Sequence, residues 1–89
     1  MANFYFMSIW PKPETKNGQL EEVMNLAIDW YRIDSKNWII YSTSNVDKWM
    51  NRLNALVKDG GTFLVIPFDK NAVNGWMTKR FWEWFNKER

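Results

Sequence analysis

The chain has no cysteine and no histidine among its 89 residues. Without cysteine it forms no disulfide bond and offers no thiolate nucleophile. Without histidine it lacks the commonest zinc ligand and the usual general base of serine hydrolases. These absences exclude Ser-His and Cys-His catalysis and the common zinc sites. We therefore predict a non-enzymatic protein with no catalytic residue, metal ligand or cofactor.

Long apolar runs are also missing, since no segment reaches the ~18 apolar residues that a membrane span requires. The N-terminal residues Met1 to Phe4 contain neither a basic segment nor a signal cleavage site. We therefore expect no membrane association and a cytoplasmic location, which the absence of cysteine permits.

Strong charge of one sign is absent too. Twelve basic and ten acidic residues give a formal net charge of +2, and the isoelectric point is about 9.0. Basic residues are scattered and stand beside acids, as in Asp47-Lys48 and Lys58-Asp59. A balanced surface of this kind permits nucleic-acid binding without arguing for it.

The length predicts one domain, residues 1–89.

Large aromatic rings are abundant, because 18% of the residues are aromatic and seven are tryptophan. Residues 3–10 form an aromatic run that ends before Pro11, and residues 62–68 form a second apolar run that contains Pro67. Both runs predict strands. Both faces of each are apolar, so we expect these two strands at the centre of a sheet.

Helical periodicity appears in two stretches, residues 18–29 and 45–58. Their apolar stripes are Leu20, Val23, Met24, Ala27 and Ile28 in the first, and Val46, Trp49, Met50, Leu53, Leu56 and Val57 in the second. Asn17 is the expected cap of the first helix, and Gly60-Gly61 is expected to end the second.

A hairpin is predicted at residues 30–33 and 38–43, which flank the polar segment Asp34 to Asn37. Residues 76–87 show helical spacing again and predict a tail helix.

This order of elements predicts an α+β fold, a ferredoxin-like split βαββαβ sandwich. Its four-stranded antiparallel sheet would carry two helices on one face, with the C-terminal helix added. The opposite sheet face would be apolar and larger than monomers usually leave in water. A second copy, the tail helix, a partner protein or stacked bases could cover it.

The segment Trp30 to Thr43 resembles the second and third strands of the SinR-like proteins, small ferredoxin-like proteins akin to the CRISPR-associated adaptation endonuclease. The tryptophan at Trp38 opens a strand, a capped helix follows, and Thr62 to Phe68 and a Trp-containing tail complete the likeness. The resemblance spans most of the chain and implies a ferredoxin-like fold that dimerises through sheets or last strands. It also suggests a phage or bacterial accessory protein linked to defence.

In the nuclease relatives an aspartate ends the first strand and holds a divalent metal between two subunits. The matching residue here is Ser8, and a hydroxyl is a poor ligand for a hard cation. The resemblance therefore does not extend to nuclease activity. Asp34 and Asp69 stand in turns, where aspartate bonds to its own backbone. A degenerate metal-dependent nuclease that uses these two carboxylates remains the third hypothesis.

Nucleic-acid binding is the second hypothesis. RNA-recognition domains share this element order and stack bases on aromatic side chains of their central strands, a role open to Phe4, Tyr5, Phe6 and Phe63. The basic-Gly-aromatic signature of those domains is missing at residues 38–42, and only Arg32 and Lys36 stand near that edge.

The first hypothesis is a binding or regulatory protein that acts through protein–protein contact, as a homodimer or with another protein. Tryptophan and arginine dominate the energetics of such interfaces. The candidate interface residues lie on the first and last strands along the chain and on the tail: Phe4, Phe6, Phe63, Val65, Trp76, Arg80, Trp82 and Trp84.

Overall fold

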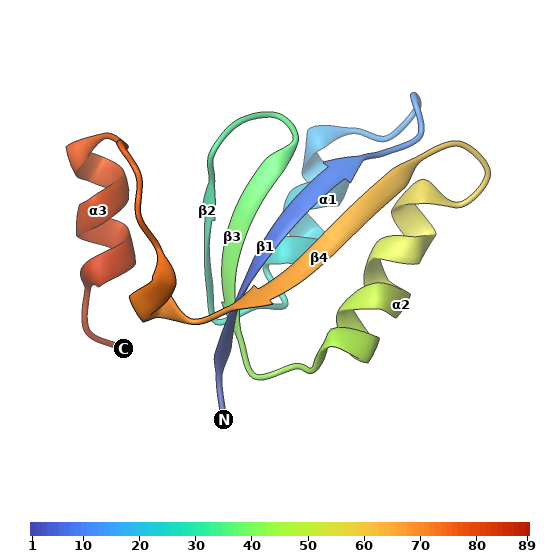
Figure 1. Cartoon of the computed structure of the whole chain (residues 1–89). Helices are drawn as coiled ribbons and strands as arrows, with labels where there is room; N and C mark the ends of the chain where they lie inside the picture. Colours follow the sequence, from blue (N-terminus) through green and yellow to red (C-terminus); the bar gives the residue numbers. More distant parts are fainter.

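The computed structural model describes residues 1–89. Strand β1 (Asn3–Trp10) lies at the centre of the molecule. It lies antiparallel between β3 (Asn37–Ser42) and β4 (Thr62–Phe68), and β2 (Asp29–Arg32) pairs antiparallel with β3. The strand order is β2-β3-β1-β4 (Figure 1). The predicted α+β class with one four-stranded antiparallel sheet is confirmed.

The order places β4 at an edge of the sheet, not at its centre. An edge strand tolerates Pro67, because proline cannot donate a backbone hydrogen bond to a second neighbour. The prediction that β4 would be central, made because both of its faces are apolar, was therefore wrong. One apolar face of β4 is buried, and the other stays partly exposed.

Helix α1 (Asn17–Met24) is shorter than the predicted helix over residues 18–29. Its cap is Lys16, not Asn17, and the side-chain carbonyl of Gln19 accepts a hydrogen bond from the backbone N–H of Lys16 at 2.7 Å. Past Met24 the chain turns, and the N–H of Ile28 donates to the carbonyl of Tyr41 at 2.8 Å. That sheet contact ends the helix early and leaves Ile28 60% exposed.

Helix α2 (Val46–Val57) begins where the Asn45 side chain accepts a hydrogen bond from the N–H of Lys48 at 2.9 Å. Its end differs from the glycine stop that was predicted. Asp59 adopts the left-handed conformation with φ 67°, and no glycine has a positive φ. Gly61 serves a different purpose, because it lies directly against the backbone of Trp10.

The main core lies between the sheet and helices α1 and α2. Alternate β1 residues Tyr5, Met7 and Ile9 point into it, together with Trp38 and Trp49, which are both fully buried. The remaining buried members come from both helices and from β3: Leu20, Met24, Ile40, Leu53, Leu56 and Val57.

The tail crosses to the other face of the sheet (Figure 1). A short 3-10 turn, η1 (Lys70–Ala72), follows β4, and α3 (Lys79–Asn86) follows after six residues without regular structure. The Thr78 hydroxyl accepts a hydrogen bond from the N–H of Phe81 at 3.2 Å and sets the start of α3. The predicted start at residue 76 was therefore too early, and Trp76 precedes the helix.

The hairpin strands begin and end one residue earlier than predicted.

No membrane-spanning helix is present, because no helix is both long enough and apolar enough to cross a bilayer.

Candidate binding surface on the sheet

Helix α3 covers part of the sheet face that α1 and α2 leave free. Phe81 and Phe85 of α3 are each 2% exposed and form a second apolar cluster with Phe4 and Ile39. Since β1 residues alternate between faces, Phe4 points toward α3 while Tyr5 points into the main core. The tail helix therefore occupies the half of this face that lies over β2 and β3.

The second cluster is mostly aromatic. The Phe4 ring lies 4.9 Å from Tyr41 and 5.2 Å from Phe85, measured between ring centroids, and Tyr31 meets Phe81 edge-on at 5.2 Å. Tilted and edge-on contacts of this kind are the favourable geometries for aromatic pairs. Phe4, one of the candidate interface residues, is thus part of the interior.

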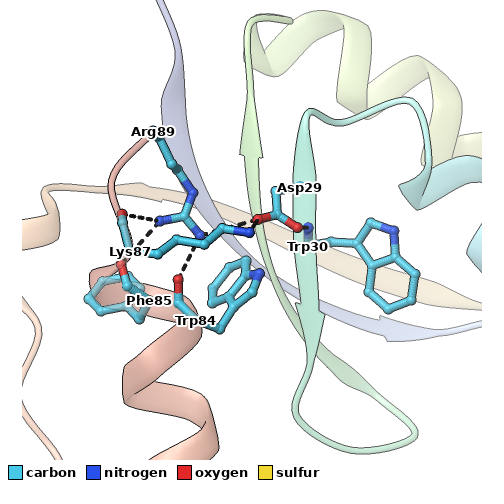
Figure 2. Close-up of polar contacts among 6 residues, drawn as sticks. All are labelled: Asp29, Trp30, Trp84, Phe85, Lys87 and Arg89. Carbon is cyan, nitrogen blue, oxygen red and sulfur yellow. Dashed lines mark hydrogen bonds and ion pairs between the residues drawn. The ribbon is translucent and has the colours of Figure 1, made fainter.

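The C-terminal end of α3 is fastened to the sheet by Arg89 and Lys87 (Figure 2). The Arg89 guanidinium donates to the carbonyls of Trp84 at 2.9 Å and Phe85 at 3.2 Å, and it reaches the Asp29 carboxylate at 3.4 Å. The Lys87 ammonium lies 2.7 Å from the same carboxylate. We call Asp29, Lys87 and Arg89 the tail latch.

Arg89 also packs as an apolar residue would. Its side chain is only 9% exposed, and the guanidinium carbon lies 4.7 Å from the centroid of the Trp84 ring and 5.3 Å from that of Phe4. A cation over aromatic faces is attracted by their quadrupoles. The Arg89 side chain thus makes an ion pair, caps the C-terminal end of α3 and packs against aromatic rings.

The latch changes the acidity of Asp29. Partial burial by itself raises the pKa of this carboxyl, but the hydrogen bond from Lys87 and the backbone N–H of Trp30 hold the pKa below its ordinary value of 3.8. The Trp84 indole N–H also favours the carboxylate, although it makes no hydrogen bond of ordinary length. We therefore assign the larger part of the lowering to Lys87.

The rest of this face, at Trp10 of β1 and at Leu64 and Ile66 of β4, is uncovered. Leu64 is 55% exposed, Ile66 48% and Trp10 44%, and Phe6 beside them is half-buried. The register pairs Phe6 with Ile66 and Ser8 with Leu64, so these side chains share one face. We call Phe6, Trp10, Leu64 and Ile66 the open strip.

A shallow apolar groove borders the open strip where the chain leaves β4. Its volume is about 350 Å³. Sheet residues form one wall and the segment after β4 forms the other, and the lining residues are Phe6, Ile39, Ile66, Phe68, Ala72, Val73 and Asn74. We call it the linker groove. Phe6 and Ile66 belong to both the groove and the strip, so the two surfaces are continuous.

The structure separates the candidate interface residues. Phe63 and Val65 pack against the main core beneath α2, on the opposite face from Phe4 and Phe6. Their grouping with Phe4 and Phe6 was therefore wrong. The register pairs Val65 with Met7, which points into that core.

The candidate residues of the tail have different surroundings. Trp84 packs against Phe4 and Tyr31, and Trp82 is half-buried beside Phe81. Trp76 is 100% exposed, and Arg80 is exposed as well. Only these last two are fully available for a partner.

Sequence reasoning missed Leu64, Ile66, Trp10 and the latch. Alternation along residues 62–68 already offered Leu64 and Ile66 as the other choice of face. No sequence signal marked Arg89, because its partners lie sixty residues away or on the aromatic cluster.

A second pocket of about 380 Å³ lies along the free edge of β2 and is lined by Trp30, Tyr31, Arg32, Arg80 and Trp84. The Arg32 guanidinium is already engaged, with the carbonyls of Asp34 and Ser35 each at 3.2 Å. Arg80 has no ion pair or hydrogen bond and is the free cation of this pocket.

The carboxylates named in the nuclease hypothesis make local hydrogen bonds. Asp34 accepts from the N–H groups of Lys36 and Asn37, which lowers its pKa, and Asp69 accepts from the N–H of Asn71 at 2.8 Å. Ser8 donates its hydroxyl proton to the side-chain oxygen of Asn37. No three acidic side chains lie close enough together to hold a metal ion.

Comparison with known proteins adds no relative: no protein-family model, curated protein or solved structure matches this chain.

Proposed function

We propose that this protein works by binding rather than catalysis, and that it forms a homodimer through the open strip. The observation that carries the proposal is the exposure of Trp10, Leu64 and Ile66 side by side on one sheet face. A contiguous apolar surface of this kind costs free energy in water and marks an interaction site. A second copy of the chain always supplies a matching apolar surface, because a two-fold interface is self-complementary.

A comparison of the two edge strands of the sheet supports β4, rather than β2, as the strand at which a second copy docks. Strand β4 spans seven residues, Thr62–Phe68, without one charged side chain. Strand β2 spans four residues and carries Asp29 and Arg32. Short length, charged side chains and proline protect a sheet edge from pairing with another chain. Strand β4 is neither short nor charged, and Pro67 is its one protecting residue. The open strip and the unprotected edge thus lie on the same strand.

The test compares Ile66→Lys with the control Leu26→Lys. Leu26 is 57% exposed but lies in the turn after α1, away from the strip. We expect the wild-type chain to dimerise in sedimentation-velocity experiments. Ile66→Lys should raise the dimer dissociation constant at least about tenfold, roughly 1.4 kcal/mol, because it buries an unpaired charge. Leu26→Lys should leave the constant unchanged.

A chain that sediments as a monomer at every accessible concentration would contradict the homodimer. An Ile66→Lys variant that dimerises as tightly as the wild type would contradict the open strip as its interface.

The second candidate function is nucleic-acid binding, and the pocket along β2 favours it. Trp84, Tyr31 and the free Arg80 together offer rings for stacking and a cation for phosphate. Retention of the wild-type chain on single-stranded RNA, lost with salt and weakened in Arg80→Ala, would support this function. Equal retention of the two proteins would count against it.

We also propose that the fold is ferredoxin-like, as the resemblance to SinR-like proteins implies. The strand order β2-β3-β1-β4 and the shared core of α1 and α2 support this assignment. A link to bacterial or phage defence rests on that resemblance alone and stays a prediction, as does the cytoplasmic location. A metal-dependent nuclease gains no support from Asp34 and Asp69, which lie in separate turns.

A further inference from the structure

Trp76 is the most exposed aromatic residue of the chain, at 100% of its accessible surface. It lies between η1 and α3, and residues 74–77 make no backbone hydrogen bond with any other part of the backbone. Gly75 precedes it, with no atom within 4 Å of the position that a Cβ would occupy. No contact within the chain therefore buries the indole, while Met77 beside it packs against the second apolar cluster.

The linker groove lies beside this segment and has no side chain in it. Its lining is apolar except for Asn74, and its volume of about 350 Å³ is at the small end of the range of ligand pockets, ~300–1,000 Å³. A single large ring is the kind of group that fills such a groove. The chain thus carries an unburied ring and an unfilled apolar groove on the same side of the sheet.

The area that a dimer interface needs is a reason to place the Trp76 ring in the linker groove. A stable interface buries ~800 Å² per partner, of which ~57%, or about 450 Å², is apolar. The half-exposed Trp10, Leu64 and Ile66 of the open strip offer about 250 Å² of apolar surface. The strip alone is too small, and one fully exposed tryptophan adds ~150–250 Å².

We infer that Trp76 of each protomer inserts into the linker groove of a second copy of this chain. This inference rests on the proposed homodimer and names its anchoring residue. A two-fold interface makes the exchange mutual, so each copy gives one ring and receives one. The groove and the open strip share Phe6 and Ile66, so the inserted ring extends the strip contact without a gap.

The experiment uses two variants that each remove one side of the exchange. Trp76→Ala keeps the groove and removes the ring. Ala72→Arg keeps the ring and places a charge at the groove, where Ala72 is exposed and lies in η1. We expect each variant alone to dimerise at least about tenfold more weakly than the wild type, measured by sedimentation velocity. Leu26→Ala, remote from both features, should behave as the wild type.

Mixing the two variants gives the decisive result. In a mixed dimer the ring of the Ala72→Arg chain can enter the intact groove of the Trp76→Ala chain, so one of the two contacts is restored. An affinity-tagged Trp76→Ala chain should therefore capture Ala72→Arg more tightly than it captures its own untagged copy. Equal capture would overturn the inference.

The remaining outcomes separate this inference from the proposed function. If Trp76→Ala dimerises like the wild type while Ile66→Lys does not, the anchor is refuted and the open-strip dimer stands. If Trp76→Ala weakens the dimer and Ala72→Arg does not, the groove is refuted as the receiving site. A wild-type chain that is monomeric refutes both.

Discussion

At the scale of single residues, a close approach between two backbone segments decides which residue position 61 accepts. A Cβ on Gly61 would lie 2.4 Å from the carbonyl oxygen of Trp10 and 3.0 Å from the nitrogen of Lys12. The obstacle is backbone, so it cannot rotate away as a side chain would. The absence of a side chain at Gly61 therefore lets the start of β4 close against the end of β1.

We predict that Gly61→Ala destabilises the protein by about 1–3 kcal/mol, because the new methyl group forces the two strand ends apart. Gly18→Ala is the matched control. Gly18 lies in α1 with nothing within 4 Å of its Cβ position, and alanine should stabilise that helix by roughly 0.5–1 kcal/mol. Urea unfolding followed by tryptophan fluorescence measures both. Equal stability of Gly61→Ala and wild type would show that the close approach relaxes freely.

At the scale of elements, α3 is a short helix whose attachment depends on residues beyond its last turn. It spans eight residues, too few for an isolated helix to be stable in water. Its aromatic face supplies burial, and Arg89 satisfies carbonyls that every helix leaves unpaired at its C-terminal end. The helix is thus held at both ends, by Thr78 and by the tail latch.

We predict that Arg89→Ala lowers the free energy of unfolding by about 2 kcal/mol, through lost charged hydrogen bonds and cation–π contacts. Lys79→Ala is the control, since its pair with Glu83 spans 3.9 Å with the lysine side chain 91% exposed. Such a pair contributes little, so we expect no measurable change. Guanidinium chloride unfolding would compare the two variants. A loss in Lys79→Ala as large as that in Arg89→Ala would contradict the latch.

The elements were predictable to different degrees. Strands 3–10 and 62–68 could be predicted to the residue, because both are apolar runs, Pro11 follows the first and Gly61 precedes the second. The end of α1 could not, because a sheet hydrogen bond at Ile28 overrides a helical pattern that continues in the sequence. The start of α3 was signalled by Thr78, a good cap that the aromatic periodicity obscured.

At the scale of the whole molecule, the class of fold followed from the order of elements, whereas the surface did not. Which face of β4 is buried depends on its pairing register with β1, and the sequence offers both choices. The choice that was made placed Phe63 and Val65 outside and so missed Leu64 and Ile66. Trp76 was named as a residue of the predicted tail helix, and the structure places it before that helix, fully exposed.

The stability of the whole molecule should fall in acid, and Asp29 should account for part of that fall. Its pKa is lowered in the folded state, so its contribution is present above the ordinary value of 3.8 and is lost as pH falls through the folded pKa. We predict that the melting temperature of the wild type drops between pH 5 and pH 2, in the acid range where carboxylates become protonated. In Asp29→Asn the drop should be smaller.

Part of the drop should remain in Asp29→Asn, because the pKa of Asp34 is lowered as well, by the backbone N–H of Lys36 and by Asn37. Melting curves at matched ionic strength would give the fall in melting temperature with pH for the wild type and for Asp29→Asn. Identical pH profiles for Asp29→Asn and wild type would mean that the carboxylate adds nothing to the attachment of α3.

The pairing of β1 with β4 also sets the order in which the molecule can fold. These strands lie near opposite ends of the chain, yet they pair along seven residue positions, from Phe4 with Phe68 to Trp10 with Thr62. Closing so long a loop is entropically costly, so this pairing should form late, after the hairpin of β2 and β3. Until then the uncharged β4 is exposed to other unfolded chains. Refolding at high concentration should therefore favour aggregation, and rapid dilution should favour recovery of the native protein.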